Sequence, residues 1–267
     1  MFPKKVNFMI TGKCNNNCKY CYAEHNGEDL DFDRLKKAFL ILKYNGVSKI
    51  TICGGEPTSR SDFNKIINFL IKNKFKIFLD TNGDFFNKYK SIITKNVSVI
   101  GLPIDFINKS YRGKNNLKNI RSILEHYKNI NKNPKIKIGT VVTKENYKHL
   151  NQIGDLIKDY KVDKWKIYQF TATGGNAKKN KKLLNITLKQ FYNSIKDLKS
   201  RYSSYFNIEI SSKKERSGSY FLIKPDGTIF TPIMDENIQK EIIVGNIFEK
   251  DIVGKWNLHT KNINLIN

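Results

Sequence analysis

The sequence predicts an α/β protein built as a partial (β/α)6 barrel of the TIM type, with a C-terminal α+β extension. Six short β-branched runs alternate with helix-like stretches between residues 5 and 171, which is typical of parallel strands joined by helices. Six units rather than eight favour an open barrel, whose ligands bind at the carboxyl ends of the strands. The length of 267 residues is enough for one large domain with a substantial core.

Each unit begins with a strand pattern, and the units are connected by amphipathic helix patterns. The expected strands are 5–11, 49–53, 75–80, 97–105, 135–143 and 164–171. The expected helices are 31–46, 61–74, 84–94, 116–130 and 146–160. The stretch 31–46 includes Gly46 as the residue that ends the first helix, and Ser61 has the side chain of an N-cap for the second.

The pattern changes after residue 172. Residues 172–182 form a basic, glycine-containing loop, and 187–202 is predicted to be a helix. The sequence Pro-Asp-Gly-Thr at 225–228 predicts a hairpin turn between two strand-like runs. We therefore divide the chain into a barrel core, residues 1–172, and an extension, residues 173–267, which packs on the barrel without being an independent domain.

The formal net charge is +24, and lysines are spread along the whole chain. This charge indicates either an anionic partner, such as a nucleotide, a nucleic acid or an acidic peptide, or a compositional drift towards lysine. The chain contains no run of eighteen apolar residues, and a strand pattern begins too early to leave room for a signal peptide. Four cysteines in a chain without a secretion signal indicate a reducing compartment, so we expect a cytoplasmic protein. Without a long apolar run, we expect no membrane partner.

Three of the four cysteines, Cys14, Cys18 and Cys21, lie within eight residues in the spacing C-x3-C-x2-C. Three thiolates can contribute to a zinc site or bind three irons of a four-iron cluster. Structural zinc needs four ligands, usually from two separated pairs, and no second cysteine pair or suitably spaced histidine pair exists. Cys53 stands alone in an apolar strand, where we expect a buried small apolar side chain. The spacing therefore favours a cluster with one open iron over zinc.

The stretch "CNNNCKYC" resembles the CxxxCxφC signature of radical S-adenosylmethionine (SAM) enzymes, and "CGGEP" at 53–57 is similar to their GGEP motif. This resemblance implies that the three cysteines hold one [4Fe-4S] cluster and that SAM chelates its open iron. Electron transfer then splits SAM into methionine and a 5'-deoxyadenosyl radical, which abstracts a substrate hydrogen. Glu56 would pair with the SAM ammonium group, and the glycines would let the backbone approach the ligand. The expected SAM-binding residues are Tyr20, Gly54, Gly55, Glu56, Pro57, Asn82, Asp105 and Arg112.

Four later segments resemble, in order, parts of viperin and its prokaryotic relatives, the SAM-dependent nucleotide dehydratases. They are "KIKIGTVVTKENYKHL", "KWKIYQF", "LLNITLKQF" and "SGSYFLIKPDGTIF". The resemblance implies abstraction of the ribose 4' hydrogen of a nucleoside triphosphate and expulsion of its 3' hydroxyl, leaving a 3'-deoxy-3',4'-didehydro nucleotide. It also implies substrate binding by Lys137, Lys166 and Tyr168 and a catalytic role for Tyr220. Gly139 and Pro103 depart from the family pattern of asparagine and serine, which leaves the substrate open.

The expected partners are a small anionic substrate, here a nucleotide, and an electron donor such as a flavodoxin or ferredoxin. One alternative is a radical SAM enzyme that modifies a peptide or protein, for which the 172–182 loop, expected to be flexible, would serve as a contact. A more distant alternative is a non-enzymatic protein that binds metal or nucleic acid. Its weakness is that no aromatic-rich platform accompanies the lysines. The sequence leaves a peptide or nucleic-acid partner open.

Overall fold

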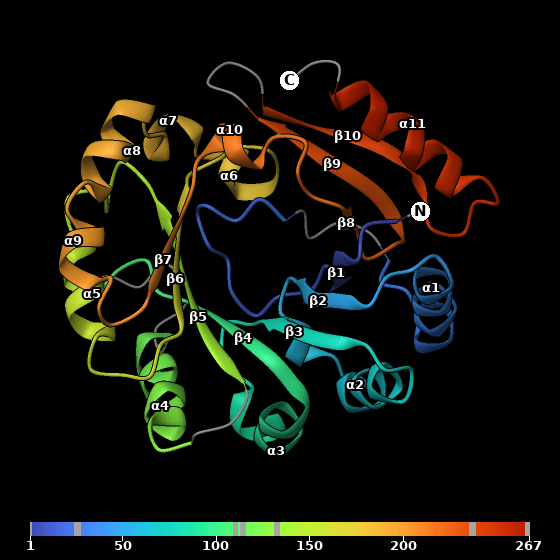
Figure 1. Cartoon of the computed structure of the whole chain (residues 1–267), viewed down its shortest axis with the longest axis horizontal. Coiled ribbons are helices and arrows are strands. Elements are labelled where there is room, and N and C mark those ends of the chain that lie inside the picture. Colours follow the sequence, from blue (N-terminus) through green and yellow to red (C-terminus); the bar gives the residue numbers. More distant parts are fainter. Residues whose placement is uncertain are drawn as a thin grey trace.

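The six strand patterns form neighbouring parallel strands of one curved sheet in the computed structural model, which describes residues 2–23, 28–108, 112, 116–130, 134–234 and 239–264. These strands are β1 (Lys5–Thr11), β2 (Lys49–Gly54), β3 (Lys76–Asp80), β4 (Val97–Pro103), β5 (Lys135–Val142) and β6 (Lys164–Gln169). The helices between them are α1 (Phe32–Tyr44), α2 (Phe63–Lys72), α3 (Phe86–Asn96), α4 (Asn116–Lys128) and α5 (Leu150–Ile157). Figure 1 shows the strands around a centre with these helices outside them.

The sheet has ten strands in the order β10-β9-β8-β1-β2-β3-β4-β5-β6-β7. The parallel strand β7 (Asn207–Ser211) extends it beside β6, and β8 (Leu222–Ile223) extends it beside β1. Strands β9 (Thr228–Met234) and β10 (Gln239–Asn246) follow as antiparallel partners. The order ends at β10 on one side and β7 on the other. The predicted α/β class and open, partial barrel are therefore confirmed.

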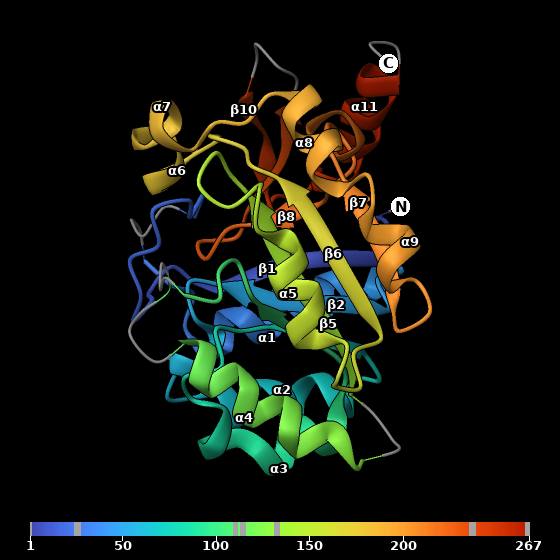
Figure 2. The same cartoon turned by 90° about the vertical axis from the view of Figure 1, so that its left-hand side faces the viewer.

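The extension also contributes several helices. They are α6 (Gly175–Lys179), α7 (Lys181–Leu184), α8 (Leu188–Ile195), α9 (Leu198–Tyr202), α10 (Lys213–Arg216) and the longer α11 (Ile252–Asn264). The expected hairpin is confirmed between β8 and β9, where Gly227 adopts a φ of +90° that favours glycine. Figure 2 shows α6 and α7 at the end of the barrel opposite α2 and α3.

Several helix boundaries differ from the sequence expectations. The N-cap position of α2 is Asp62 rather than Ser61, and the Asp62 carboxylate is bound to Arg60 instead of capping the helix. Helix α5 begins only at Leu150, because the Asn146 side chain accepts the main-chain N–H of Thr143 at 2.7 Å and holds a turn there. The predicted helix 187–202 is split into α8 and α9.

Alternation along the strands separates an outer face from an inner face. In β6, the Trp165 ring packs on the outer side against Tyr202 and Phe206, at centroid distances of 6.2 and 6.0 Å. Lys166 and Tyr168 are half-buried and point the other way, towards the inside of the curved sheet. The inner face is therefore where polar side chains of the strands gather. Within the described ranges, no helix combines the length and apolar character needed to cross a membrane.

Candidate active site

The cysteine loop follows β1 and carries three reduced thiols. Cys18 is buried, whereas Cys14 and Cys21 are half-buried. Burial raises the pKa of all three thiols, that of Cys18 to about 12, and the nearby Arg112 guanidinium opposes this shift. Among the described residues, no three cysteine, histidine, aspartate or glutamate side chains are grouped as a ready-made metal site. Three sulfur donors on one loop beside a fixed cation fit the ligand chemistry of an iron–sulfur cluster.

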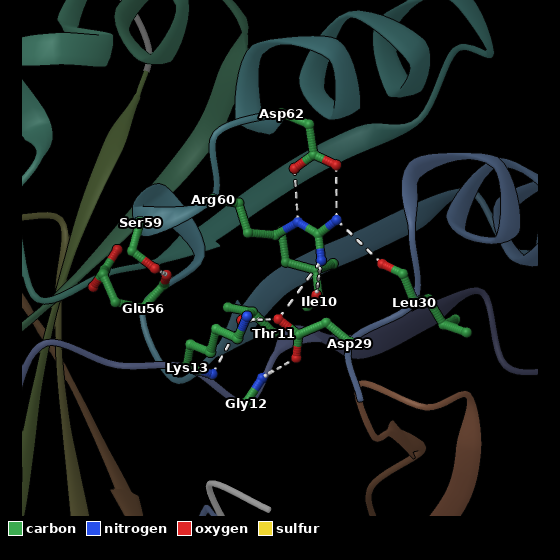
Figure 3. Close-up of polar contacts among 10 residues, drawn as sticks. All are labelled: Ile10, Thr11, Gly12, Lys13, Asp29, Leu30, Glu56, Ser59, Arg60 and Asp62. Atoms are coloured by element: carbon green, nitrogen blue, oxygen red, sulfur yellow. Dashed lines mark hydrogen bonds and ion pairs between the residues drawn. The ribbon is translucent and has the colours of Figure 1, made fainter. Parts of the chain in front are cut away.

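The base of this loop is fastened by two polar residues that the sequence analysis did not identify. Asp29 accepts the Thr11 hydroxyl at 2.5 Å and the main-chain N–H of Gly12 at 2.8 Å. Arg60 lies behind it, with one guanidinium nitrogen donating to the carbonyl of Ile10 at 2.8 Å and lying 3.9 Å from the Asp29 carboxylate. Figure 3 shows how these groups meet where β1 ends. The loop therefore leaves the strand in a fixed direction.

The glycines of the GGEP motif bring the β2 end into contact with the cysteine loop. The main-chain N–H of Gly55 donates to the Thr11 carbonyl, and that of Glu56 donates to the Lys13 carbonyl, both at 2.8 Å. A Cβ on Gly54, whose φ is +136°, would lie 2.3 Å from the Thr11 carbonyl oxygen, and one on Gly55 would lie 2.1 Å from that of Lys13. The structure shows that these glycines make room for the loop backbone, and the expected approach of SAM to them stays a prediction.

Glu56 is completely buried and joins two loops. Its Oε1 accepts the main-chain N–H of Thr58 at 3.0 Å, the Thr58 hydroxyl, and the Thr81 hydroxyl at 2.6 Å. Its Oε2 accepts the main-chain N–H of Asn82 at 2.6 Å. Burial raises the pKa of Glu56, and these four donors work against that rise. Pro57 begins a 3-10 turn (Pro57–Ser59), where its fixed φ is suitable. Glu56 thus braces the β2 end against the loop after β3, and its pairing with SAM stays a prediction.

The loop after β3 holds the far side of the cysteine loop. Asn82 donates from its side chain to the Asn15 side-chain oxygen at 2.9 Å. Asn15 and Asn16 both donate to the Asp84 carboxylate, at 2.6 and 3.2 Å. The sequence analysis assigned Asn82 to SAM binding and did not identify the other three residues. The spacing residues between the first two cysteines therefore have their own partners.

Three predicted SAM-binding residues meet beside the cysteine loop. The Tyr20 hydroxyl donates to Asp105 Oδ2 at 2.6 Å, and Arg112 Nε donates to the same oxygen at 2.7 Å. The Arg112 guanidinium also lies 4.9 Å from the centre of the Tyr20 ring. Burial acts to lower the pKa of Arg112, but attraction to Asp105 outweighs it and the pKa is raised. Of the stretch 103–113, residues 109–111 and 113 lie outside the described residues.

The segment 172–182 is not the flexible loop that the sequence predicted, because it folds into α6 and the start of α7. Helix α6 lies on the cysteine loop. The Asn176 side chain donates to the carbonyl of Cys18 at 3.2 Å, and the Asn180 side chain donates to that of Lys19 at 3.1 Å. The sequence analysis missed both asparagines, since nothing local in the sequence connects them with the cysteines.

Close backbone contact reinforces this attachment. The main-chain N–H of Ala177 donates to the carbonyl of Cys21 at 2.9 Å. Gly175 has a φ of +48°, and a Cβ there would lie 2.5 Å from the carbonyl oxygen of Ala23. A larger residue at this position would push α6 away from the loop.

Lys137, a predicted substrate-binding residue, forms an ion pair on the inner face. Its Nζ lies 2.6 Å from Asp80 Oδ1 on β3. Burial acts to lower the pKa of Lys137, but the attraction and hydrogen bond of Asp80 outweigh it, so the pKa is raised. Gly101 on the intervening strand leaves the space for this pair, since a Cβ there would lie 1.9 Å from the Asp80 oxygen.

Lys166 forms the second ion pair of this face. Its Nζ lies 2.5 Å from Glu209 Oε1, and Lys164 Nζ lies 2.5 Å from Oε2 of the same carboxylate. Lys166 and Glu209 are direct partners in the register of β6 and β7. Burial acts to raise the pKa of Glu209, but hydrogen bonds from the two lysines outweigh it and lower the pKa to about 2. The carboxylate is therefore charged throughout the neutral range.

Aromatic groups complete the inner face. The Tyr168 ring lies 5.3 Å from Lys166 Nζ and 5.6 Å from the guanidinium carbon of Arg216 in α10. Arg216 donates to two main-chain carbonyls. These acceptors carry no net charge, so they do not neutralise the positive charge of the guanidinium group. Tyr220 and Cys53 are both half-buried and pack against one cluster of buried apolar residues, so Cys53 is not fully buried as expected. The structure thus brings the predicted substrate residues together and adds Arg216, which the sequence analysis missed.

The fold and the site define a class of enzyme that carries a loop with three cysteines at the carboxyl end of the first strand of a partial barrel. The family model described as the Radical SAM superfamily matches residues 8–157, and the chain belongs to this superfamily. Membership implies SAM and an iron–sulfur cluster as cofactors. It also overturns the alternative of a non-enzymatic metal- or nucleic-acid-binding protein.

Some of the curated proteins that resemble this chain carry a more specific name than that of the superfamily. The chain is 26% identical to an S-adenosylmethionine-dependent nucleotide dehydratase of Selenomonas ruminantium, over 92% of this chain and 91% of that protein. It is 28% identical to a protein of the same name from Flammeovirga pacifica, over 84% of this chain and 81% of that one.

Solved structures share the fold. Streptococcus suis SuiB bound to S-adenosylmethionine has a TM-score of 0.73 at 18% identity, covering 96% of this chain. This chain spans 65% of SuiB, which is less than two thirds of its length. The anSMEcpe structure with bound AdoMet and the Kp18Cys peptide has a TM-score of 0.71 at 15% identity, covering 97% of this chain and 82% of that one. At these identities the likeness shows the fold alone.

Proposed function

We propose that this radical SAM enzyme removes water from a nucleotide that binds on the inner face of the sheet. The observation that carries the proposal is the gathering of Lys137, Lys166 and Arg216 around Tyr168 on the inner face of the curved sheet. Such cations suit the phosphate groups of a nucleotide. The relatives named nucleotide dehydratases, which match most of this chain, support the same substrate class.

The ion pairs prepare the lysines for this role. Asp80 and Glu209 hold the ammonium groups of Lys137 and Lys166 in place, so little side-chain freedom is lost when a phosphate binds. Arg216 adds a further positive charge, and its two hydrogen-bond acceptors among the described residues are main-chain carbonyls rather than carboxylates. A phosphate chain beside these three groups would place the nucleoside against the tyrosine rings.

Protein groups then orient the substrate for the reaction. The cluster and SAM, once bound, supply the 5'-deoxyadenosyl radical that takes the ribose hydrogen. We assign the shielding of the reacting sugar from water to the Tyr168 and Tyr220 rings, which stand half-buried on the inner face. The phenol of Tyr220 is our candidate for donating a proton to the departing hydroxyl group. Loss of a hydrogen atom and of hydroxide leaves the nucleotide one electron short, so one further electron from the external donor would complete the 3'-deoxy-3',4'-didehydro nucleotide that the sequence resemblance implies.

The peptide-modifying alternative has less support. The segment 172–182, which the sequence analysis offered as a contact for a peptide, is engaged by the cysteine loop through Asn176 and Asn180. SuiB and anSMEcpe share the fold at 15–18% identity, which does not transfer their substrates to this chain. The inner-face cations favour a small phosphorylated substrate instead.

The test is a panel of nucleoside triphosphates added to the anaerobically reconstituted enzyme with SAM and dithionite. One triphosphate should increase the release of 5'-deoxyadenosine and appear as a product lighter by one water. If no nucleotide stimulates the reaction, the proposed substrate is wrong while membership of the superfamily stands.

A variant series connects the activity with the inner face. Lys166→Met should raise KM for the nucleotide about ten- to a hundredfold, because one charged hydrogen bond to phosphate is lost. The double variant Lys166→Met/Glu209→Gln removes the carboxylate left behind and should show the same rise. Lys76→Met, at the exposed start of β3, is the matched control and should leave KM unchanged.

A further inference from the structure

A surface rich in lysine adjoins the cysteine loop. Lys178 and Lys179 on α6 and Lys181 and Lys182 on α7 are exposed, as is Lys19, between the second and third cysteines. Neither residues 12–23 nor residues 164–196 include an aspartate or glutamate. The two segments that build this lysine surface therefore carry no negative charge of their own.

This surface is attached directly to the loop that would hold the cluster. Asn176 and Asn180, on the same helical segment as the lysines, donate to the carbonyls of Cys18 and Lys19. The third attachment is the hydrogen bond from Ala177 to the carbonyl of Cys21. Figure 2 shows α6 and α7 next to the blue N-terminal loop. A protein bound to this surface would therefore stand one helix away from the cluster ligands.

Exposed apolar side chains follow the lysines along the chain. Leu183 on α7 is 47% exposed, and Leu188 and Tyr192 on the following helix are 38% and 45% exposed. Leu188 and Tyr192 are four positions apart, so they share one face of α8. Exposed apolar residues next to a charged rim are typical of a protein-binding surface.

We propose that the lysine surface docks an acidic, low-potential one-electron carrier protein of the flavodoxin or ferredoxin class. The carrier loses one electron and the cluster gains it, so charge and electrons balance. Opposite charges speed such encounters without requiring a large interface, which suits a partner that binds, delivers an electron and leaves. The inference rests on membership of the radical SAM superfamily and not on the nucleotide substrate.

The decisive comparison uses two electron sources for the cluster-loaded enzyme. SAM cleavage to 5'-deoxyadenosine is measured with enzymatically reduced flavodoxin and with dithionite. The test variant changes Lys178, Lys179, Lys181 and Lys182 to Gln. The control changes four exposed lysines of α2 and α3 to Gln, namely Lys65, Lys72, Lys90 and Lys95, and thereby removes the same charge from the opposite end of the barrel.

We expect the test variant to raise KM for flavodoxin about tenfold at low salt and to leave the dithionite-driven rate unchanged. The control should match the wild type in both assays. The difference should shrink near 0.5 M salt, where the screening length is about 4 Å. Binding of oxidised flavodoxin, measured by isothermal titration calorimetry without turnover, should weaken by the same factor.

Three results would overturn the proposal. They are an unchanged KM and affinity for flavodoxin, an equal effect of the control variant, or an equal loss of the dithionite-driven rate, which would assign the lysines to the fold or to a peptide substrate. If the fourfold variant loses iron, the double variant Lys179→Gln/Lys182→Gln is used, with an expected threefold rise in KM. Because 5'-deoxyadenosine is read without added nucleotide, failure here is distinguishable from failure of the nucleotide assignment.

Discussion

Glu56→Gln removes a buried negative charge and converts one carboxylate oxygen into an amide donor. The amide oxygen can keep the donors from Thr58 and Thr81, but the amide nitrogen then faces the main-chain N–H of Asn82, which lies 2.6 Å from Oε2. Two donors would oppose each other where Glu56 has no exposed surface. An unsatisfied buried N–H costs about 1–3 kcal/mol, and weakening the charged hydrogen bonds costs about 1 kcal/mol more. We expect the free energy of unfolding to fall by about 3 kcal/mol.

The assay is urea unfolding of the cluster-free protein, followed by circular dichroism. A lower midpoint with an unchanged slope reports lost stability. Glu209→Gln is the control, because the Glu209 side chain is 37% exposed and its ion pairs are screened by solvent, so its loss should cost under about 1 kcal/mol. If Glu56→Gln stays within about 0.5 kcal/mol of the wild type and only SAM binding weakens, the bracing role is wrong and the ammonium partner expected from the sequence is the principal role.

Gly54→Ala should lower both stability, by about 2 kcal/mol or more, and the iron content after reconstitution, because its Cβ meets the Thr11 carbonyl oxygen at 2.3 Å. Gly139→Ala is its control, since the nearest atom to a Cβ there lies 3.5 Å away, and equal behaviour of the two variants would contradict the close-contact explanation. For Glu209, the pKa of about 2 lies below its ordinary value of 4.5, so its contribution is complete above pH 4.5 and is lost as the pH falls towards 2. The stability difference between wild type and Glu209→Gln, which is under about 1 kcal/mol at pH 5, should therefore become smaller as the pH falls to 2, as measured by urea unfolding at each pH, and a constant difference would refute the ion-pair cause.

The barrel was predictable because its elements follow local patterns. Strand alternation and helical spacing are set by neighbouring residues, and β1 to β6 appear where the sequence places them. The errors occur where distant contacts decide. The N-cap position of α2 is Asp62 and not Ser61. Arg60 binds the Asp62 carboxylate and also donates to a main-chain carbonyl at the end of β1, and these contacts fix where the helix begins. The helix expected at 187–202 is broken before Leu198, and the Tyr202 hydroxyl donates to the carbonyl of Asn151 at 3.0 Å.

The candidate site divides in the same way. Cysteine spacing and the GGEP motif identified the loop and the chemistry that it would carry. The types of ligand residue and their short spacings can be read from a few neighbouring residues of the sequence. The partners of those residues were not predictable. Asn176 lies 158 positions from Cys18, and Arg60 lies 50 positions from the Ile10 carbonyl that it holds. No local sequence pattern shows that an asparagine or arginine side chain will donate to a main-chain oxygen far away in the chain.

The sequence by itself determined the superfamily, the three thiols of the cysteine loop and the alternating architecture of the barrel. Only the tertiary structure decided that Gly54 and Gly55 make room for that loop, and that α6 covers it. It also decided that Lys137 and Lys166 face Asp80 and Glu209 across the inner surface. The physical reason is that donor chemistry and periodicity belong to short stretches of chain, whereas a buried polar group takes its partner from whichever segment the fold brings within hydrogen-bond distance.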